Sequence, residues 1–364
     1  MKIIQLIQKP QRRGAEIFAA QLAEELTKKG HEVMVVSIFK GDTELRFLDN
    51  QVDLNRMPKQ RFVDIRAWHK FSQIIKEFEP HLIQANAADT LKFAVFSKKL
   101  FHWKTPIVYR NANQMGDFIR GRLHRALNQW LLNATTAVVS VSESSRRDFH
   151  HTFKYQNRIS SIISIGIAPG EIKDKIAEPI RITGLPENYL IQIGSLVPEK
   201  DPLGLLDLFS KIMKEFSDLN LLFVGSGPLE FQLKVAIRKK GLENQVKLVP
   251  NQTNIFPVLA RAKGLLVHSR IEGLPGVILE AMYCRVPVVA YDVGGIGEVL
   301  IHKQTGWLVP KNDQFEFIQA IREILQSTPN QLDAITSHAR FLVEKHYHLN
   351  TIVQRFEELY EKVI

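Results

Sequence analysis

Cysteine and long apolar runs are nearly absent from this sequence, and each shortage excludes a class of protein. The 364 residues contain one cysteine, which excludes a disulfide framework and a cysteine-based zinc site and favours a reducing compartment. No apolar run reaches the roughly 18 residues that a membrane span requires. Only six residues separate Lys2 from Lys9, too few for the apolar core of a signal peptide. We therefore expect a cytoplasmic protein that at most lies peripherally on the inner face of the membrane.

Acidic side chains are scarce in the first half of the chain only. Residues 1–175 carry 28 basic and 17 acidic side chains, whereas residues 176–364 carry 20 and 21. This imbalance predicts that the first half approaches an anionic partner: an anionic membrane, an acidic or diphosphate-bearing acceptor, or nucleic acid. A solubilising surface without a partner is the alternative. No nucleic-acid recognition motif accompanies the charge, so we expect no nucleic-acid partner.

The period of the apolar residues switches repeatedly between strand and helix patterns. A helix is expected over 15–29, others over 202–216 and 228–240, and a last helical stretch over 332–364. Strands are expected at residues 2–7, 31–38, 81–85, 105–110, 135–142, 189–194, 220–225, 245–249, 264–269 and 286–291. Short buried strands separated by helices are typical of an α/β fold with parallel sheets covered on both faces.

The length of the chain favours two domains of ordinary size. Prolines and glycines cluster in residues 168–186 and indicate a linker. We place one Rossmann-like domain at 1–172 and a second at 173–345, followed by a C-terminal helix at 346–364. Two such domains facing each other would leave a deep cleft, where ligands usually bind in these folds.

Three strand-to-helix turns in the second half carry residues suited to a phosphate ligand. The first reads GSLVPEKDP, with Lys200 just before a helix that opens with Asp201 and Pro202. A cation beside free backbone N–H groups at a helix start is a good seat for phosphate, although a capped helix with an exposed lysine explains the pattern equally well. The second turn, Gly225-Ser226-Gly227-Pro228, permits a tight turn and is weak on its own.

The third turn, SRIEGLPGVILEAM, is the most specific. Glu272 lies in a Gly/Pro-rich loop, and Glu280 lies in the helix that starts near Pro275. The first N–H groups of that helix are unpaired by construction, so they can hold an anion while the two carboxylates accept hydrogen bonds from hydroxyl groups. A sugar joined through diphosphate to a ribose has this arrangement of parts. The alternative is that neither glutamate binds a ligand: one carboxylate caps the helix and the other lies on its solvated face.

These motifs together resemble the retaining nucleotide-sugar glycosyltransferases of family 4. The resemblance rests on EGLPGVILEAM, VPVVAYDVGGIGEV and TGWLVP in this order, with GSLVPEKD and VGSGPLE upstream and RRGAEIFAAQLAEELTKKGHEV at the start. It covers nearly the whole chain and implies the GT-B fold: two Rossmann-like domains, a donor held mainly by the second, and a last helix that returns to the first.

The resemblance also implies roles for individual residues. Glu272 and Lys200 are the catalytic candidates: Glu272 would hold hydroxyls of the transferred sugar and Lys200 would neutralise the diphosphate. Glu280 would hold the ribose, and Gly14 would let the backbone approach the diphosphate. The donor-binding candidates are Gly14, Ser195, Gly225, Gly273, Leu274, Pro275, Gly276, Val277 and Glu280. Such transferases need no metal or other cofactor, and no Asp-x-Asp pair stands in the sequence.

The chain departs from the family pattern at several positions. Ser195 stands where the family usually has an arginine, so Arg12, Arg13 or Arg270 is a candidate to replace that cation. Arg285 stands where the family often has glycine. The family's histidine after the fourth or fifth strand is also missing. We assign Asn86, Arg110 and Asn113 to the acceptor side, where these histidines would lie.

Two stretches interleave cations with aromatic residues, residues 92–104 and 118–130. They are typical either of a face that binds anionic lipid or of aromatics packed on the sheet with cations left in water. We expect packing for most of the aromatics. The histidines lack metal-ligand spacing, and we expect His268 to be a residue at the end of a strand.

The sequence as a whole favours a retaining, metal-independent glycosyltransferase. It would move a sugar from a nucleotide-diphosphate sugar to a glycan or lipid-linked acceptor, in cell-envelope glycan, lipopolysaccharide or glycolipid synthesis. In the mechanism that the resemblance implies, the departing phosphate oxygen takes the acceptor's proton. A sugar-nucleotide epimerase or phosphorylase of the same fold and a non-catalytic sugar-nucleotide-binding subunit are the alternatives.

Overall fold

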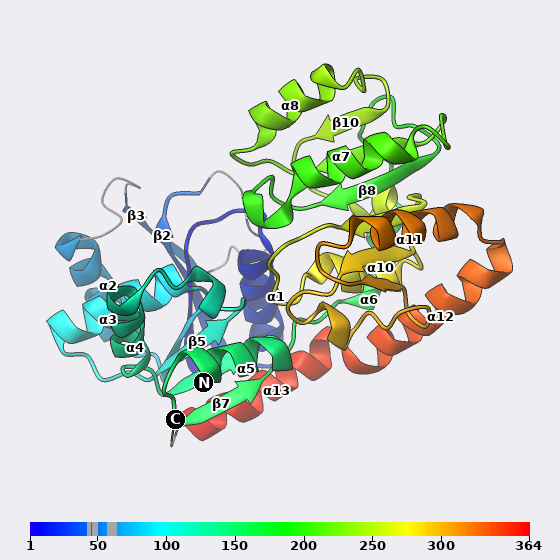
Figure 1. Cartoon of the computed structure of the whole chain (residues 1–364). Helices are drawn as coiled ribbons and strands as arrows, with labels where there is room; N and C mark the ends of the chain where they lie inside the picture. Colours follow the sequence, from blue (N-terminus) through cyan, green and yellow to red (C-terminus); the bar gives the residue numbers. More distant parts are fainter. Residues whose placement is uncertain (42–44, 46–49, 57–63, 157) are drawn as a thin grey trace. The chain divides into compact units, whose positions relative to one another are not determined.

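The computed structural model describes residues 1–41, 45, 50–56, 64–156 and 158–364. Within them the chain divides into two compact units. Unit 1 comprises residues 1–165 and 350–364, and unit 2 comprises residues 166–349. Each unit contains its own parallel sheet covered by helices (Figure 1). The prediction of an α/β fold with two Rossmann-like domains is confirmed.

The sheet of unit 1 has seven described strands in the order β3-β2-β1-β4-β5-β6-β7, and every pair of neighbours is parallel. The strands are β1 (Lys2–Ile7), β2 (Glu32–Phe39), β3 (Gln51–Arg56), β4 (Leu82–Ala85), β5 (Ile107–Asn111), β6 (Ala137–Ser140) and β7 (Ile159–Ile162). The helices are α1 (Gly14–Lys28), α2 (Ile65–Phe78), α3 (Ala88–Phe101), the 3₁₀ turn η2 (Gly116–Phe118), α4 (Arg122–Leu132), α5 (Glu143–Thr152) and α13 (Leu349–Val363). Strands β3 and β7 lie at the two edges and were not predicted.

Alternation along the strands decides which helices cover each face of this sheet. Ile4, Leu6 and Ile83 point into a core with the apolar sides of α2, α3, α4 and α5. Gln5 and Gln84 are register partners on the opposite face, where they meet Tyr360 of α13. The Tyr360 hydroxyl donates to Oε1 of Gln84 at 2.6 Å and accepts from Nε2 of Gln5 at 3.3 Å.

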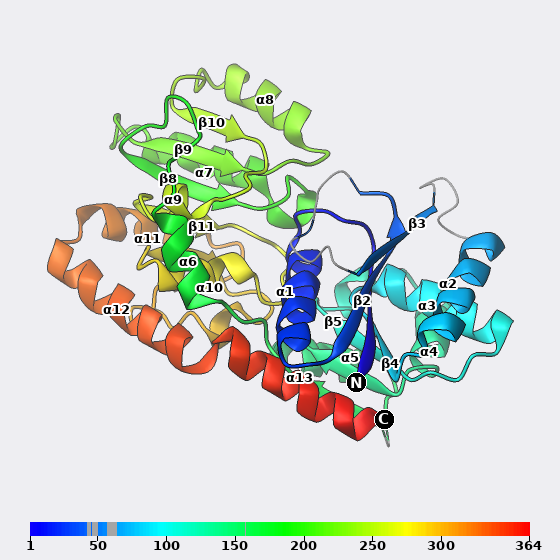
Figure 2. The ribbon, with the colours of Figure 1, turned by 180° about the vertical axis from the view of Figure 1, so that it is seen from behind.

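The last helix of the chain packs on unit 1 beside α1 (Figure 2). The rings of Phe18 in α1 and Phe356 in α13 lie 5.8 Å apart, and Glu357 pairs with His31 at 2.8 Å. The stretch expected to be helical over 332–364 consists of two helices, α12 (Pro329–His346) and α13. The interruption has a physical cause: Ile167 donates its N–H to the carbonyl of Tyr347 and accepts the N–H of Leu349, which forms a β-bridge beside the break.

The sheet of unit 2 has six described strands in the order β10-β9-β8-β11-β12-β13, again parallel throughout. The strands are β8 (Tyr189–Ile193), β9 (Asn220–Val224), β10 (Val246–Val249), β11 (Gly264–Val267), β12 (Val288–Tyr291) and β13 (Trp307–Val309). The helices are α6 (Pro169–Ile176), η3 (Pro198–Lys200), α7 (Pro202–Ile212), α8 (Glu230–Lys239), α9 (Phe256–Leu259), α10 (Gly276–Tyr283), η4 (Ile296–Glu298), α11 (Gln314–Gln326) and α12. Helix α6 lies within the stretch expected to be a linker, so that stretch is partly helical, with Pro169 at the favoured first position.

Candidate functional site

Four loops meet at one edge of the sheet of unit 2. They follow β8, β9, β11 and β12, and the carboxyl ends of parallel strands lie at the same edge. Backbone hydrogen bonds join the loops in pairs: Leu196 donates to the carbonyl of Ser226 at 3.1 Å, Arg270 to that of Glu199 at 2.8 Å, and Gly295 to that of Gly273 at 2.5 Å. The three turns singled out in the sequence are therefore parts of one surface.

Glycine is required where these loops touch. Gly225 has φ +151° and Gly294 has φ +61°, both in the region that other residues avoid. A Cβ atom on Gly225 would lie 2.0 Å from the carbonyl oxygen of Gly194, and one on Gly294 would lie 2.0 Å from that of Glu272. Backbone thus packs directly on backbone at both contacts, and the position of Glu272 depends on the loop after β12.

The centre of this surface is an ion pair between Lys200 and Glu272. Lys200 ends η3, and its carbonyl accepts a hydrogen bond from Nε2 of Gln192 at 3.1 Å. Its Nζ donates to Oε1 of Glu272. The side chain of Glu272 is 7% exposed and that of Lys200 is 24% exposed. A carboxylate this buried is stable only with a partner, so the lysine compensates a charge that would otherwise be costly.

A second cluster lies directly beside the pair. Asp201 caps α7 by accepting the N–H of Gly204 at 3.3 Å, so the helix is capped as in the alternative interpretation of this turn. Its Oδ2 also lies 3.0 Å from Nη2 of Arg270 and 3.3 Å from Nδ1 of the buried His268. Burial acts to raise the pKa of Asp201, but the neighbouring His268 and Arg270 outweigh it and lower the pKa. The cluster fixes the backbone that carries Lys200.

The contacts of this cluster were missed in the sequence. Arg270 was a candidate to replace the arginine absent at Ser195, but in the structure its guanidinium is paired with Asp201. His268 follows the end of β11, as expected, and its ring packs 4.7 Å from that of Tyr291. No sequence spacing relates Asp201 to His268, which lies 67 positions later, or to Arg270. The only signal in the sequence is that Asp201 and these two residues follow strands predicted to belong to one sheet.

Helix α10 supplies the next part of the surface. It begins at Gly276, and Pro275 before it offers no side-chain cap, so the N–H groups of Gly276 and Val277 have no acceptor within the helix. Glu280 lies one turn further along and is half-buried. Burial raises its pKa to about 7, with Lys175 opposing the shift. Near neutral pH such a carboxyl can both donate a hydrogen bond to a hydroxyl group and accept one.

The remaining candidates of unit 2 lie in the same loops. Ser195 follows Gly194 at the end of β8, and Gly225 follows β9 against it. The run from Gly273 to Val277 leads from Glu272 into α10, with Leu274 buried. The structure thus brings together Lys200, Glu272 and the predicted donor-binding residues of unit 2 along adjoining loops.

The other four candidates lie in unit 1. Gly14 is the first residue of α1, with open space where a Cβ would stand. Asn86 is buried after β4, where its amide donates to Oε1 of Gln5 at 3.0 Å and accepts from Nε2 of Gln84 at 2.9 Å. Arg110 is buried in β5, and Asn113 is exposed in the loop that follows.

The guanidinium of Arg110 lies 4.4 Å from the ring centre of Phe18. Its Nε and Nη1 have no hydrogen-bond partner among the described residues. Burial lowers the pKa of Arg110 to about 10, although the electrostatic influence of Tyr360 and Glu16 opposes the shift. Asn86 is therefore engaged within the sheet, whereas Arg110 retains donors without acceptors.

The two basic-aromatic stretches differ in the structure. Phe93 is buried, and Phe96, Phe101 and Trp103 pack against the core, as expected. In the second stretch, however, Leu123 is 89% exposed, and the other exposed apolar side chains are Phe118, Leu127 and Trp130. The packed interpretation is right for the first stretch and wrong for most of the second.

Two further properties concern metals and membranes. Among the described residues no group of three or more His, Cys, Asp or Glu side chains is placed to hold a metal ion. Within the same residues, none of the helices combines the length and apolarity that crossing a bilayer would take.

Comparison with known proteins assigns the family. The family model for Glycosyltransferase Family 4 matches residues 12–170, and that for Glycosyl transferases group 1 matches residues 177–340. The two matches together span most of both units. The chain belongs to the family 4 glycosyltransferases. The resemblance inferred from the motifs is confirmed.

Two relatives of this glycosyltransferase match along most of their length. An uncharacterized glycosyltransferase of Haemophilus influenzae is 25% identical over 355 residues, covering 94% of this chain and 95% of the relative. A Campylobacter jejuni protein is 23% identical over 338 residues, covering 89% of each chain. It is named as an α-1,4-N-acetyl-D-galactosaminyltransferase acting on a glycan joined through diphosphate to undecaprenol. The crystal structure of Anabaena HepE with UDP-glucose superposes over 100% of both chains, with a TM-score of 0.84 at 21% identity, and so shares the fold.

Proposed function

We propose that this glycosyltransferase moves a sugar from a nucleotide-diphosphate sugar to an acceptor hydroxyl with retention of the anomeric configuration and without a metal. The observation that carries the proposal is the Lys200–Glu272 pair beside the first N–H groups of α10. A cation and helix N–H groups suit a diphosphate, and a carboxylate suits sugar hydroxyls. HepE was crystallised with UDP-glucose, and the fold it shares is in keeping with such a donor.

On this proposal the two partners of the ion pair exchange neighbours when the donor binds. Lys200 turns from Glu272 to the diphosphate, and Glu272 becomes free to accept hydrogen bonds from hydroxyls of the transferred sugar. The N–H groups of Gly276 and Val277 hold a phosphate oxygen, and Glu280 binds the ribose. Positive groups already in place for the charge that develops on the leaving diphosphate lower the barrier, typically by several kcal/mol.

The reaction then proceeds on one face of the sugar. The bond between the anomeric carbon and the diphosphate oxygen breaks, and its electron pair stays with the diphosphate. The acceptor oxygen bonds to the anomeric carbon on the same face, and its proton passes to the departing phosphate oxygen. Lys200 stabilises the leaving group throughout. The role of Gly14, which belongs to unit 1, stays a prediction.

The test is a thermal-shift panel of UDP-, GDP-, ADP- and TDP-sugars followed by a transfer or donor-hydrolysis assay with the donor that binds. A ligand at 100 times its dissociation constant stabilises by about 2.7 kcal/mol. The Glu272→Gln variant should keep the fold and lose turnover by orders of magnitude. Near-normal turnover of this variant would overturn the proposed role.

A non-catalytic sugar-nucleotide-binding subunit is the second candidate, and one observation favours it. Arg270 is engaged by Asp201 and so does not stand free to replace the arginine that is absent at Ser195. Such a subunit would bind a sugar nucleotide in the thermal-shift panel yet show neither transfer nor hydrolysis. The Ser195→Arg variant distinguishes the cases further, since a weakened enzyme should gain activity from it.

We also propose that unit 1 contacts an anionic membrane through α4 and the turn before it. Apolar side chains stand exposed there, Leu123 at 89% and Trp130 at 41%, among the exposed cations Arg120, Arg122 and Arg125. Such a face suits a bilayer with anionic headgroups. This surface, together with a relative named for a lipid-linked acceptor, supports a place in cell-envelope glycan synthesis.

Co-sedimentation with vesicles tests this surface. The chain should bind phosphatidylglycerol vesicles and not phosphatidylcholine vesicles, and Leu123→Glu should release it. Phe231→Glu is the matched control, because Phe231 is 74% exposed on α8 of unit 2. Equal effects of the two variants would refute the assignment of the surface to α4.

A further inference from the structure

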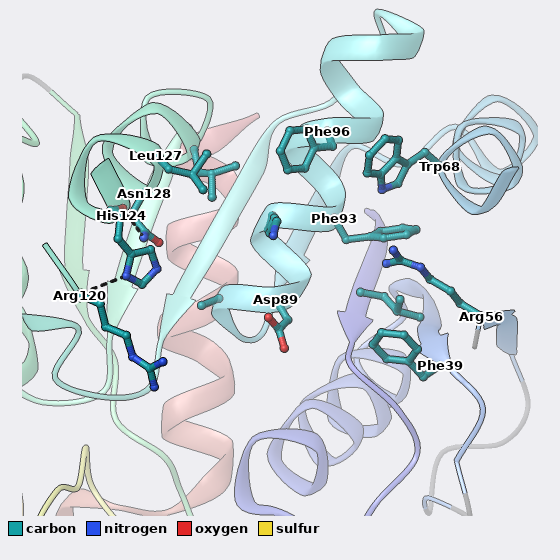
Figure 3. Close-up of a pocket in the computed structure, with 14 residues that line it drawn as sticks. Phe39, Arg56, Trp68, Asp89, Phe93, Phe96, Arg120, His124, Leu127 and Asn128 are labelled. Atoms are coloured by element: carbon teal, nitrogen blue, oxygen red, sulfur yellow. Dashed lines mark hydrogen bonds between the residues drawn. The ribbon is translucent and has the colours of Figure 1, made fainter. Parts of the chain in front are cut away.

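Unit 1 contains a cavity of about 420 Å³ that none of the residues in the proposed donor site lines. It lies between the end of β2, α2, α3 and α4, with side chains from all four pointing into it (Figure 3). Its volume falls within the range of about 300–1,000 Å³ typical of small-molecule pockets. The lining combines an aromatic wall, which suits an apolar group, with several cations, which suit an anionic group.

The aromatic wall runs from the interior of unit 1 to its surface. Trp68 and Phe96 stack with ring centres 5.3 Å apart, and Phe96 contacts Trp130 at 5.6 Å. Leu127 lines the cavity and is itself 40% exposed. The wall therefore continues into the exposed apolar face of α4. A hydrocarbon chain lying along it would transfer apolar surface from water to aromatic and aliphatic side chains.

The cationic part centres on Arg56, which ends β3 and is 6% exposed. Its guanidinium lies 5.5 Å from the ring centre of Phe39 and 5.7 Å from that of Phe93. Its Nε forms an ion pair with Asp64, 3.2 Å from Oδ2 but without the geometry of a hydrogen bond, and among the described residues its Nη2 has no hydrogen-bond partner. Asp64 compensates part of this charge, but a buried donor is costly to leave unpaired, so the Nη2 side of this arginine is suited to a further anionic acceptor.

The other polar side chains of the cavity add to this preference. Lys92 and Arg120 are cationic, against the single carboxylate of Asp89, which already accepts a hydrogen bond from Gln8 at 2.6 Å. The backbone N–H of Arg120 donates to Nδ1 of His124 at 3.1 Å (Figure 3). His124 must then carry its proton on Nε2, which makes that atom a donor. The cavity offers an anion several donors and one carboxylate.

We propose that this cavity binds the phosphate-bearing end of an amphiphilic acceptor, with the phosphate on Arg56 and Arg120 and the hydrocarbon against Phe96 and Leu127. The inference rests on the proposed function, because it names the acceptor class of the transferase. A neutral glycan would bring no counter-charge to the cations that line the cavity. A free phosphate would leave the aromatic wall unused.

Isothermal titration calorimetry with farnesyl diphosphate tests the proposal, with inorganic diphosphate and farnesol as the two half-ligands. Farnesyl diphosphate should bind, and each half-ligand should bind at least about tenfold more weakly, because it lacks either the charged hydrogen bonds or the apolar contact. Arg56→Gln should weaken binding of farnesyl diphosphate about tenfold or more. Since a change at a buried arginine can impair folding, Arg120→Ala, at an exposed position, should weaken it severalfold.

Two control variants distinguish binding in this cavity from binding in the donor site and from attraction by surface charge. Arg66→Ala removes an exposed arginine from α2 that does not line the cavity, and it should leave affinity unchanged. Lys200→Met should also leave it unchanged, because a diphosphate bound in the donor site would need Lys200. Equal loss in Arg66→Ala and Arg120→Ala would mean attraction by charge alone and would overturn the proposal.

Other outcomes are equally decisive. Equal affinity for inorganic diphosphate and farnesyl diphosphate would assign the cavity to free phosphate and overturn the amphiphile. Loss of binding in Lys200→Met would move the ligand to the donor site and overturn the cavity. Failure of the proposed function has a different signature: no sugar nucleotide stabilises the chain, while farnesyl diphosphate still binds and responds to Arg120→Ala.

Discussion

The ion pair between Lys200 and Glu272 leads to a prediction in which the two partners are not equivalent. Lys200→Met leaves a carboxylate whose side chain is 7% exposed without its counter-charge, whereas Glu272→Gln leaves an ammonium group on a side chain that is 24% exposed. Water reaches the lysine far better than the glutamate. We therefore expect the lysine variant to be the less stable of the two, although each removes the same pair.

The structure sets the magnitude. Leaving a buried polar group without its partner costs about 1–3 kcal/mol, and more when the group is charged. We expect Lys200→Met to lower the free energy of unfolding by less than the roughly 3–5 kcal/mol seen when a fully buried pair is broken, because Lys200 is partly solvated. Glu272→Gln should cost less than about 1 kcal/mol, as for an exposed pair. For a unit of this size each kcal/mol lowers Tm by about 2–4 °C.

Differential scanning fluorimetry of both variants and the double variant measures these effects, and a transfer assay measures turnover. The double variant removes both charges of the pair, so it should be more stable than the sum of the single effects predicts, by about 1 kcal/mol or more. Turnover should fall about 100- to 1,000-fold in each single variant, as when a stabilising donor is removed. Stability effects that add within about 0.5 kcal/mol, or equal losses in the two single variants, would refute the reasoning.

Three other predictions follow from the geometry. Burial raises the pKa of Glu280 to about 7, so between its usual pKa and pH 7 this carboxyl keeps its proton in the folded protein and loses it in the unfolded chain. The free energy of unfolding should therefore fall as the pH rises from 5 to 8. Glu280→Gln should remove up to about 3 kcal/mol of that fall, and an unchanged pH dependence of Tm in this variant would contradict the prediction. Gly294→Ala should destabilise unit 2 by roughly 2 kcal/mol or more, because its Cβ would meet the Glu272 carbonyl, while Gly170→Ala, with open space around it, should leave Tm unchanged or higher. Tyr360→Phe should lower the stability of unit 1 by about 1–3 kcal/mol in denaturant unfolding, since Gln84 loses its donor; no change would mean that water replaces the hydroxyl.

The central strands of both sheets could be predicted from the sequence, whereas the two edge strands of unit 1 could not. A strand covered on both faces is mostly apolar, so KIIQLI and VVAY are visible as short apolar runs even though the first contains the buried Gln5. Strands β3 and β7 lie at the edges of the sheet and read QVDLNR and ISSI. These polar sequences are typical of loops. They form strands because each pairs with a neighbouring strand, and that pairing cannot be seen in the local sequence.

The candidate site was predictable where a motif carries the chemistry within one loop. Lys200, Glu272 and Glu280 each stand in a strand-to-helix turn, and the parallel topology brings such turns to one edge of the sheet. Whether Arg270 is free was not predictable, because its partner Asp201 lies 69 positions earlier. The same holds for the predicted acceptor side. Asn86 follows a strand, where an acceptor-binding residue could lie, but its side chain is buried and hydrogen-bonded to Gln5 and Gln84.

The sequence by itself determined the α/β fold, the family and the turns that hold the candidate donor residues, since these depend on local periodicity and on contiguous motifs. Only the tertiary structure decided which charges are paired, and it alone revealed the cavity around Arg56. That cavity is lined by residues from β2, β3, α2, α3 and α4, which are far apart along the chain. Pairing and enclosure depend on distances between such segments, and folding alone sets those distances.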